Sequence, residues 1–174
     1  RVVAQAGPAP ELMVVDLDFF KSINDAFGHT RGDHVLTEFA QRARVAIRAS
    51  DLVFRYGGDE FVVLLPGATR EQSEQVAQRL LNAICTTPFA GDPPLSLTVS
   101  IGIARYPDDA LSADQLFAIA DRRSFQAKRW GRSRFFSSDI KTNNLIDPPA
   151  RLIERDSELE QLALTSELVS MIAR

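Results

Sequence analysis

The chain has a single cysteine, Cys85, and no long apolar run. One cysteine excludes an intramolecular disulfide framework, and its place in an apolar helical stretch favours a buried structural thiol over a nucleophile. No apolar run approaches the roughly 20 residues that span a bilayer, and the first residues lack the basic-then-apolar plan of a signal peptide. These absences favour a protein of the reducing cytoplasm that makes no membrane contact through this chain.

The chain also lacks a strong excess of charge of one sign. The formal net charge of its 174 residues is −3, which argues against a broad nucleic-acid-binding surface. The phosphates of a nucleotide need only a few cations brought together locally, so a nucleotide ligand is not excluded. With 45% hydrophobic and 25% charged residues, the chain can build one ordinary core plus an appendage.

The most informative segment is RYGGDEF, residues 55–61, because it places two glycines and two acids between two apolar runs. The pattern predicts a hairpin with its chemistry at the tip. Gly57 and Gly58 let a flat ligand approach the backbone, while Asp59 and Glu60 supply hard oxygen ligands for Mg²⁺. Taken alone, the segment fits an ordinary solvated hairpin better.

A second acidic cluster follows the apolar run 12–15, where the sequence reads Asp16-Leu17-Asp18. An apolar run without alternation predicts a strand buried on both faces, with Asp16 near its carboxyl end. If this strand and the hairpin are neighbours, Asp16, Asp59 and Glu60 converge, and divalent metals would relieve their mutual repulsion. The alternative is that Asp16 and Asp18 merely end a strand and begin a turn.

The order of expected elements is β-α-α-β-β-α-β-α-β, which favours an α+β fold with helices packed on a sheet. Thr69 is a plausible N-cap for the helix that follows it. The expected strands are 12–17, 52–56, 61–65, 95–104 and 133–137; the expected helices are 19–27, 31–48, one starting after Thr69, and 113–129.

With these segments in register, the chain resembles the GGDEF family of diguanylate cyclases from about Leu12 to Phe136. The resemblance implies a central, mostly antiparallel sheet flanked by helices, similar to the palm of class III nucleotide cyclases and polymerases. Beyond the two acidic segments, the matches are Phe20-Lys21, Asn24-Asp25, Gly28-His29, Gly32-Asp33, Arg48 to Asp51, Ser100 to Ala104, Ala120-Asp121, Ala127-Lys128 and Gly131-Arg132.

The implied reaction is condensation of two GTP molecules into cyclic di-GMP and two pyrophosphates. Asp16, Asp59 and the backbone carbonyl of Leu17 would hold two Mg²⁺ ions per half-site, with Mn²⁺ as an alternative metal. Glu60 would be a further ligand or would help to deprotonate the attacking hydroxyl. Because each half-site holds one GTP, catalysis implies a homodimer, transient or constitutive.

The resemblance also implies how the substrate is bound. Asn24 and Asp33 would read the guanine, since a carboxylate can accept from guanine N1–H and the exocyclic amine together. Lys21, Lys128 and Arg132 would contact the triphosphate. Singly, each of these cations fits an ordinary solvated surface residue.

The tetrapeptide Arg48-Ala49-Ser50-Asp51 matches the RxxD inhibitory site of the family, and Arg79 falls where the family often adds a second arginine. The resemblance implies that cyclic di-GMP binds here and inhibits synthesis. The alternative is an ordinary surface ion pair at a helix end. A second reading of the whole chain is a non-catalytic domain that binds GTP or cyclic di-GMP and controls an attached domain.

Residues 1–138 are expected to form the cyclase domain with a truncated start, and residues 139–150 a linker. Residues 151–174 are expected to form a charged helix that docks on the core, pairs with a second protomer or leads into a further domain. The whole would be the cytoplasmic output part of a larger sensor. Within the core, Arg123-Ser124-Phe125 replaces the family's usual Ala-Leu-Tyr, so this helix is expected to pack differently.

Overall fold

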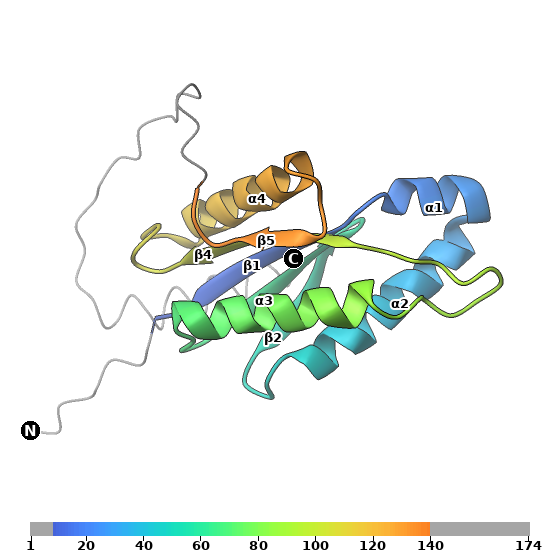
Figure 1. The fold of residues 1–174 in the computed structure, drawn as a ribbon. Helices are drawn as coiled ribbons and strands as arrows, with labels where there is room; N and C mark the ends of the chain where they lie inside the picture. Colours follow the sequence, from blue (N-terminus) through green and yellow to red (C-terminus); the bar gives the residue numbers. More distant parts are fainter. Residues whose placement is uncertain (1–8, 140–174) are drawn as a thin grey trace, which may run out of the picture.

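The computed structural model describes residues 9–139, which form five strands and four helices in the predicted order. The strands make one sheet in the order β2-β3-β1-β4-β5, antiparallel throughout except for the parallel β4–β5 pair (Figure 1). The predicted α+β class is confirmed. The elements are β1 (Glu11–Leu17), α1 (Phe20–Phe27), α2 (His29–Ala46), β2 (Leu52–Gly57), β3 (Glu60–Leu65), α3 (Arg70–Cys85), β4 (Val99–Arg105), α4 (Ala113–Arg129) and β5 (Arg134–Phe136).

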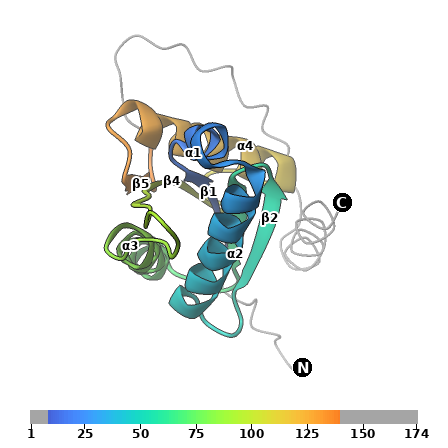
Figure 2. The same cartoon turned by 90° about the vertical axis from the view of Figure 1, so that its right-hand side faces the viewer.

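The central strand β1 is buried along its whole length, as its unbroken apolar run predicts. Its side chains alternate between two cores. Met13 and Val15 pack with α2 and α3 on one face, whereas Leu12 and Val14 pack with α4 on the other. Figure 2 shows the resulting three layers, with the sheet between these helices. Asp16 follows Leu12 and Val14 in the alternation and therefore belongs to the α4 side.

Helix α4 lies very close to β4 because Gly102 has no side chain. A Cβ at Gly102 would lie 1.9 Å from the carbonyl oxygen of Ala120 and 2.3 Å from the amide nitrogen of Ser124. The Ser124 hydroxyl also donates to the carbonyl of Ser100 at 3.1 Å. This close approach fixes the height of α4 above the sheet, and with it the position of the residues at the C-terminal end of α4.

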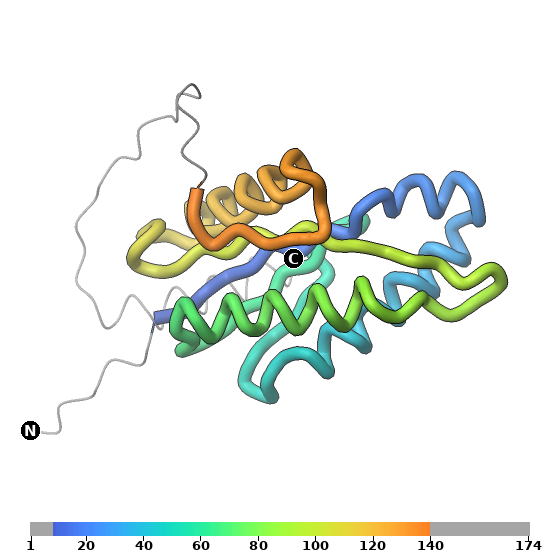
Figure 3. The backbone as a smooth tube through the Cα atoms, viewed as in Figure 1, coloured from blue at the N-terminus to red at the C-terminus, as the bar shows by residue number. Residues whose placement is uncertain are grey.

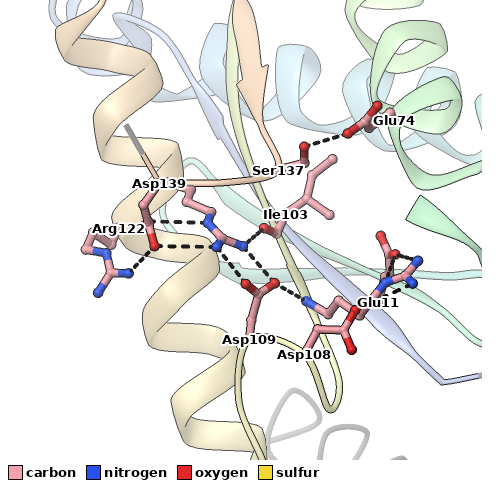
Figure 4. Close-up of polar contacts among 10 residues, drawn as sticks. Glu11, Glu74, Ile103, Asp108, Asp109, Arg122, Ser137 and Asp139 are labelled. Carbon is pink, nitrogen blue, oxygen red and sulfur yellow. Dashed lines mark hydrogen bonds and ion pairs between the residues drawn. The ribbon is translucent and has the colours of Figure 1, made fainter. Parts of the chain in front are cut away.

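The Arg123-Ser124-Phe125 sequence buries a charged side chain beneath α4 and leaves an aromatic one exposed. Arg123 is buried, with 4% of its surface exposed, whereas Phe125 is 58% exposed. The Arg123 guanidinium donates to the carbonyl of Ile103 at 2.6 Å and to both carboxylate oxygens of Asp109 at 2.8 and 2.7 Å. A longer contact of 3.4 Å joins it to Asp139, which follows β5 (Figure 4). An ion-pair network therefore joins α4 to the turn after β4 and to the segment after β5.

The boundaries of the helices follow local signals. The predicted N-cap at Thr69 is confirmed: its hydroxyl accepts from the Gln72 amide, and the Gln72 side chain accepts from the Thr69 amide. Helix α2 begins at His29 and ends at Ala46, two residues earlier at each end than predicted.

The predicted strand 95–104 is wrong at its start, because β4 begins only at Val99. Leu95 instead pairs with Phe89 in an isolated bridge. The carbonyl of Thr98 accepts from the Asp18 amide at 2.9 Å, so the chain joins the turn after β1 before the regular β1–β4 pairing begins.

The loop between α3 and β4 runs along α2 (Figure 3). Arg42 of α2 donates to the carbonyls of Thr87 and Pro88, and Arg31 donates to that of Pro93 at 2.9 Å. Glu38 accepts from the Ala90 amide at 3.0 Å. The loop is thus fastened to α2 by side chains that reach its backbone.

The predicted helix 151–174, most of the predicted linker and residues 1–8 lie outside the described residues. Among the helices within residues 9–139, none is long and apolar enough to cross a membrane.

Candidate active site

The two predicted acidic segments lie side by side. Strands β1 and β3 pair so that Asp16 is opposite Glu60, and the amide of Leu17 donates to the carbonyl of Asp59 at 3.1 Å. Lys128, at the end of α4, places its Nζ 2.5 Å from Oδ2 of Asp16. Asp16, Asp59, Glu60 and Lys128 therefore lie near one another where the β2–β3 turn lies against the end of β1.

The turn of the hairpin is open on the side of its glycines. Nothing lies within 4 Å of where a Cβ would stand at Gly57 or Gly58, and Gly58 has a positive φ of 24°. Arg55 fixes the turn, since its Nε and Nη2 donate to the Gly58 carbonyl at 3.1 and 2.9 Å. A ligand can therefore approach the backbone of this turn closely, as the sequence predicts.

The site is electrostatically unfavourable for its carboxylates. Burial, opposed by the nearby Lys128 and reinforced by Asp59 and Glu60, raises the pKa of Asp16 to about 6. Burial also raises the pKa of Glu60, with further contributions from Asp121 and Asp59. Both shifts mean that the site gains free energy when positive charge enters it.

The donor chemistry of this cluster fits a divalent cation. Its carboxylate oxygens are the ligands that Mg²⁺ prefers. Burial, with a smaller contribution from neighbouring carboxylates, makes the charged forms of Asp16 and Glu60 costly without a cation, as their raised pKa values indicate. Within residues 9–139, no three His, Cys, Asp or Glu side chains are already grouped closely enough to hold a metal ion. Metal binding would therefore require Asp16, Asp59 and Glu60 to turn their side chains toward a common point.

The predicted guanine-reading residues lie on the neighbouring helices α1 and α2. Asn24 fits against Gly32, where a Cβ would lie 1.9 Å from its Oδ1. That buried oxygen has no hydrogen-bond partner among the described residues. Asp33 is exposed and lines a groove of about 930 Å³ between α2 and the hairpin, which also includes Phe61. Asp33 therefore faces a ligand-sized groove, whereas Asn24 is not among the residues that line this groove.

The three basic residues predicted to contact the triphosphate lie in different parts of the fold. Lys128 is at the carboxylate cluster, and Arg132 lies in the turn between α4 and β5, with its guanidinium 4.3 Å over the ring of Phe19. Lys21 is an exposed residue of α1. Arg132 and Phe19 both have positive φ, of 59° and 61°, which is uncommon outside glycine.

Asp51 does not form the surface ion pair with Arg48 that was the alternative to a product-binding site. Asp51 is only 3% exposed, and its carboxylate accepts from the backbone amide of Arg48 at 2.9 Å, which closes the turn after α2. Arg48 is exposed, while Nε of Arg79 donates to the carbonyl of Ala46 at 3.0 Å. Both arginines are thus held near the end of α2, at the opposite end of β2 from the glycine turn.

Sequence reasoning gave no role to Asp18 or Phe19. Asp18 is buried and accepts from the hydroxyls of Thr98 and Ser100 at 2.7 and 2.8 Å. The only signal that could have revealed it was its spacing from Asp16, since one residue between them places their side chains near the same strand end.

The fold is thus a five-stranded sheet in which an acid-bearing hairpin lies beside the central strand. The family model for the diguanylate cyclase, GGDEF domain matches residues 4–134. The chain therefore belongs to the GGDEF family.

The relatives agree with this assignment. The response regulator PleD of Caulobacter vibrioides is 39% identical over 130 residues, covering 73% of this chain and 29% of PleD. The diguanylate cyclase DgcP of Pseudomonas aeruginosa is 44% identical over 125 residues, covering 71% of this chain and 18% of DgcP. The chain thus spans less than a third of the length of either relative.

Solved GGDEF domains share the fold. That of YfiN from Pseudomonas aeruginosa is 37% identical, with a TM-score of 0.68, over 73% of this chain and 80% of that one. The GGDEF domain of DgcB from Caulobacter crescentus, solved in complex with c-di-GMP, is 26% identical, with a TM-score of 0.64, over 72% of this chain and 75% of that one.

Proposed function

We propose that this chain is an active diguanylate cyclase domain that condenses two GTP molecules into cyclic di-GMP and two pyrophosphates. The observation that carries the proposal is the meeting of Asp16, Asp59, Glu60 and Lys128 at the glycine turn, in a chain of the GGDEF family. The substrate would be GTP, so we place the domain in the cytoplasm, as the output part of a longer protein.

In this proposal Asp16, Asp59, Glu60 and the carbonyl of Leu17 hold two Mg²⁺ ions, or Mn²⁺, which would activate the attacking 3′-hydroxyl and neutralise the leaving pyrophosphate. Alternatively, Glu60 would not bind a metal and would accept the proton of that hydroxyl. Gly57 and Gly58 leave the turn open to the α-phosphate. Lys128, Arg132 and Lys21 would balance the charge of the triphosphate.

Guanine selection would depend on Asn24 and Asp33. The exposed carboxylate of Asp33 can accept from guanine N1–H and the exocyclic amine, a pair of donors that adenine does not offer in that arrangement. Asn24 can occupy its position only because Gly32 has no side chain, since a Cβ there would overlap the side-chain oxygen of Asn24. The identity of residue 32 should therefore influence GTP binding without touching the metal site.

We expect Gly32→Ala to weaken binding of 3′-deoxy-GTP, a probe that cannot condense, by about three- to tenfold, because the new methyl group displaces Asn24. The helix should survive, since alanine favours helices more than glycine does. Titration calorimetry in Mg²⁺ measures the change. In an Asn24→Ala background the same substitution should add little, and unchanged affinity of Gly32→Ala itself would contradict the placement of the guanine.

Because each domain holds one GTP, we propose that catalysis takes place in a homodimer with two sites facing each other. Product would bind at Arg48 and Arg79, whose guanidinium groups suit phosphate and guanine edges. Asp51 would hold the turn after α2 through its hydrogen bond to the Arg48 amide, and its other carboxylate oxygen would accept a hydrogen bond from the product. Product held between two domains would then prevent their GTP sites from meeting.

Arg48→Ala should leave the initial rate of synthesis unchanged and remove inhibition by added cyclic di-GMP, because the exposed guanidinium is lost while the turn, held through the backbone amide, remains. Affinity for product should fall at least about tenfold in calorimetry. Arg48→Lys, which keeps the charge and loses the planar fork, should lie between the two. Equal product affinity in all three proteins would show that Arg48 is an ordinary surface residue and does not bind the product.

A further inference from the structure

Asp18 is a buried carboxylate at which three parts of the chain meet. Its side chain has no exposed surface and accepts from the hydroxyls of Thr98 and Ser100, which lie in and just before β4. The amide of Ser133 points at Oδ2 from 3.4 Å, and Nε of Arg132 lies 3.8 Å from Oδ1. Asp18 therefore connects the turn after β1 with the turn between α4 and β5.

The turn between α4 and β5 needs such support because its backbone is unusual. Gly131, Arg132 and Ser133 all have positive φ, of 105°, 59° and 50°, and two of them are not glycine. The amide of Arg132 donates to the carbonyl of Ala127 at 2.9 Å, which closes the end of α4. In addition, the Asp18 carboxylate accepts from the Ser133 amide and faces the Arg132 guanidinium. It therefore supports Arg132 and Ser133, the two residues of this turn other than glycine that have positive φ.

The guanidinium of Arg132 is fixed from two sides. Asp18 faces its Nε, and the ring of Phe19 lies 4.3 Å beneath it. Phe19 directly follows Asp18 and has a positive φ of its own, 61°, so the same turn supplies both supports. The Arg132 side chain remains 39% exposed, and its guanidinium has further N–H donors with which to bind an anion.

We propose that Asp18 is the residue that positions Arg132 for the triphosphate of the substrate. It acts through Arg132 and through the conformation of residues 131–133, and does not itself touch nucleotide or metal. This inference rests on the proposed function, in which Arg132 binds the triphosphate. It predicts that removing the negative charge of Asp18 weakens triphosphate binding. Electrostatics alone would give the opposite effect, because removing a negative charge near an anion site strengthens anion binding.

The test measures 3′-deoxy-GTP and GMP binding in Mg²⁺ for the whole chain, Asp18→Asn, Arg132→Ala and the double variant. Asp18→Asn should weaken 3′-deoxy-GTP binding about threefold or more, leave GMP binding unchanged, and add nothing to the roughly tenfold loss of Arg132→Ala. Asp25→Asn removes the same charge from an exposed position of α1 and should not weaken binding. Trp130, the only tryptophan, reports by fluorescence anisotropy whether the turn loosens in Asp18→Asn.

Unchanged or tighter 3′-deoxy-GTP binding by Asp18→Asn, or losses that simply add in the double variant, would overturn the assignment. If circular dichroism shows that Asp18→Asn does not fold, Thr98→Val replaces it in the test. That change removes one hydrogen bond to Asp18 and keeps the carboxylate. A loss of 3′-deoxy-GTP affinity is again expected, and wild-type affinity would overturn the proposal. If the unmodified chain binds no 3′-deoxy-GTP, the proposed function fails together with this inference.

Discussion

Glu60→Gln is expected to lower the rate of cyclic di-GMP synthesis by about 10²- to 10⁴-fold while the protein stays folded. The amide has almost the same shape as the carboxylate, but it carries no charge for a metal and cannot accept the proton of the 3′-hydroxyl. Burial and the neighbouring Asp121 and Asp59 make the charge of Glu60 costly in the ligand-free protein, so its loss should not reduce stability. Initial rates from chromatography of product, with thermal unfolding alongside, measure both effects.

The matched control for this change is Glu71→Gln, which makes the same substitution at an exposed position near the start of α3. Its rate should equal that of the wild type. A Glu60→Gln protein that works within twofold of the wild type would show that the carboxylate cluster is not the reaction centre.

The largest expected effect on stability comes from Arg123→Ala. The change leaves Asp109 facing a cavity without its bidentate partner and removes the donor to the Ile103 carbonyl (Figure 4). Removing one member of a buried ion pair costs about 3 to 5 kcal/mol, which corresponds to a fall of roughly 10 to 20 °C in the midpoint of thermal unfolding for a domain of this size. Denaturant titration gives the free energy of unfolding directly.

Arg129→Ala, at an exposed position of the same helix, provides the comparison and should change the free energy of unfolding by less than about 1 kcal/mol. Arg123→Met would keep most of the volume and lose the charge. If Arg123→Ala were as stable as Arg129→Ala, the network around Asp109 would contribute nothing to holding α4 on the sheet.

The same network predicts the direction of a pH effect. Burial alone would raise the pKa of Asp109, but its hydrogen bond and charge interaction with Arg123 bring that pKa below its ordinary value. A carboxyl group with a lowered pKa in the folded state adds stability above its unfolded pKa and loses it as the pH falls toward the folded value. The stability difference between wild type and Arg123→Ala should therefore be complete near neutral pH and shrink below about pH 4.

Much of the fold was readable from the sequence because its signals are local. The apolar run before Asp16, the glycine turn between two apolar strands and the capping pair at Thr69 each predict an element without knowledge of the rest. The start of β4 was not predictable in this way. Leu95 looks like a strand residue, but its partner is Phe89, and a pattern along the chain does not say which strand a residue will join.

The acidic cluster could be predicted once the two segments were recognised, because neighbouring strands bring their ends together. The hydrogen bonds of the neighbouring residue Asp18 could not be predicted from the sequence. Asp18 is held by the hydroxyls of Thr98 and Ser100, which lie 80 and 82 residues away along the chain. Asp51 is a similar case: its spacing from Arg48 suggested a product site or, as the alternative, a surface ion pair, but it did not reveal that the carboxylate accepts from the Arg48 backbone amide.

The central claim is that the chain synthesises cyclic di-GMP at the glycine turn. The direct measurement incubates the purified chain with GTP and Mg²⁺, after copurified cyclic di-GMP has been removed, and quantifies nucleotide and pyrophosphate. The account predicts one cyclic di-GMP and two pyrophosphates for every two GTP consumed, none with ATP, and none when EDTA removes the metal. Binding of 3′-deoxy-GTP without any product from GTP would contradict it, and would leave a nucleotide-binding domain that regulates an attached partner.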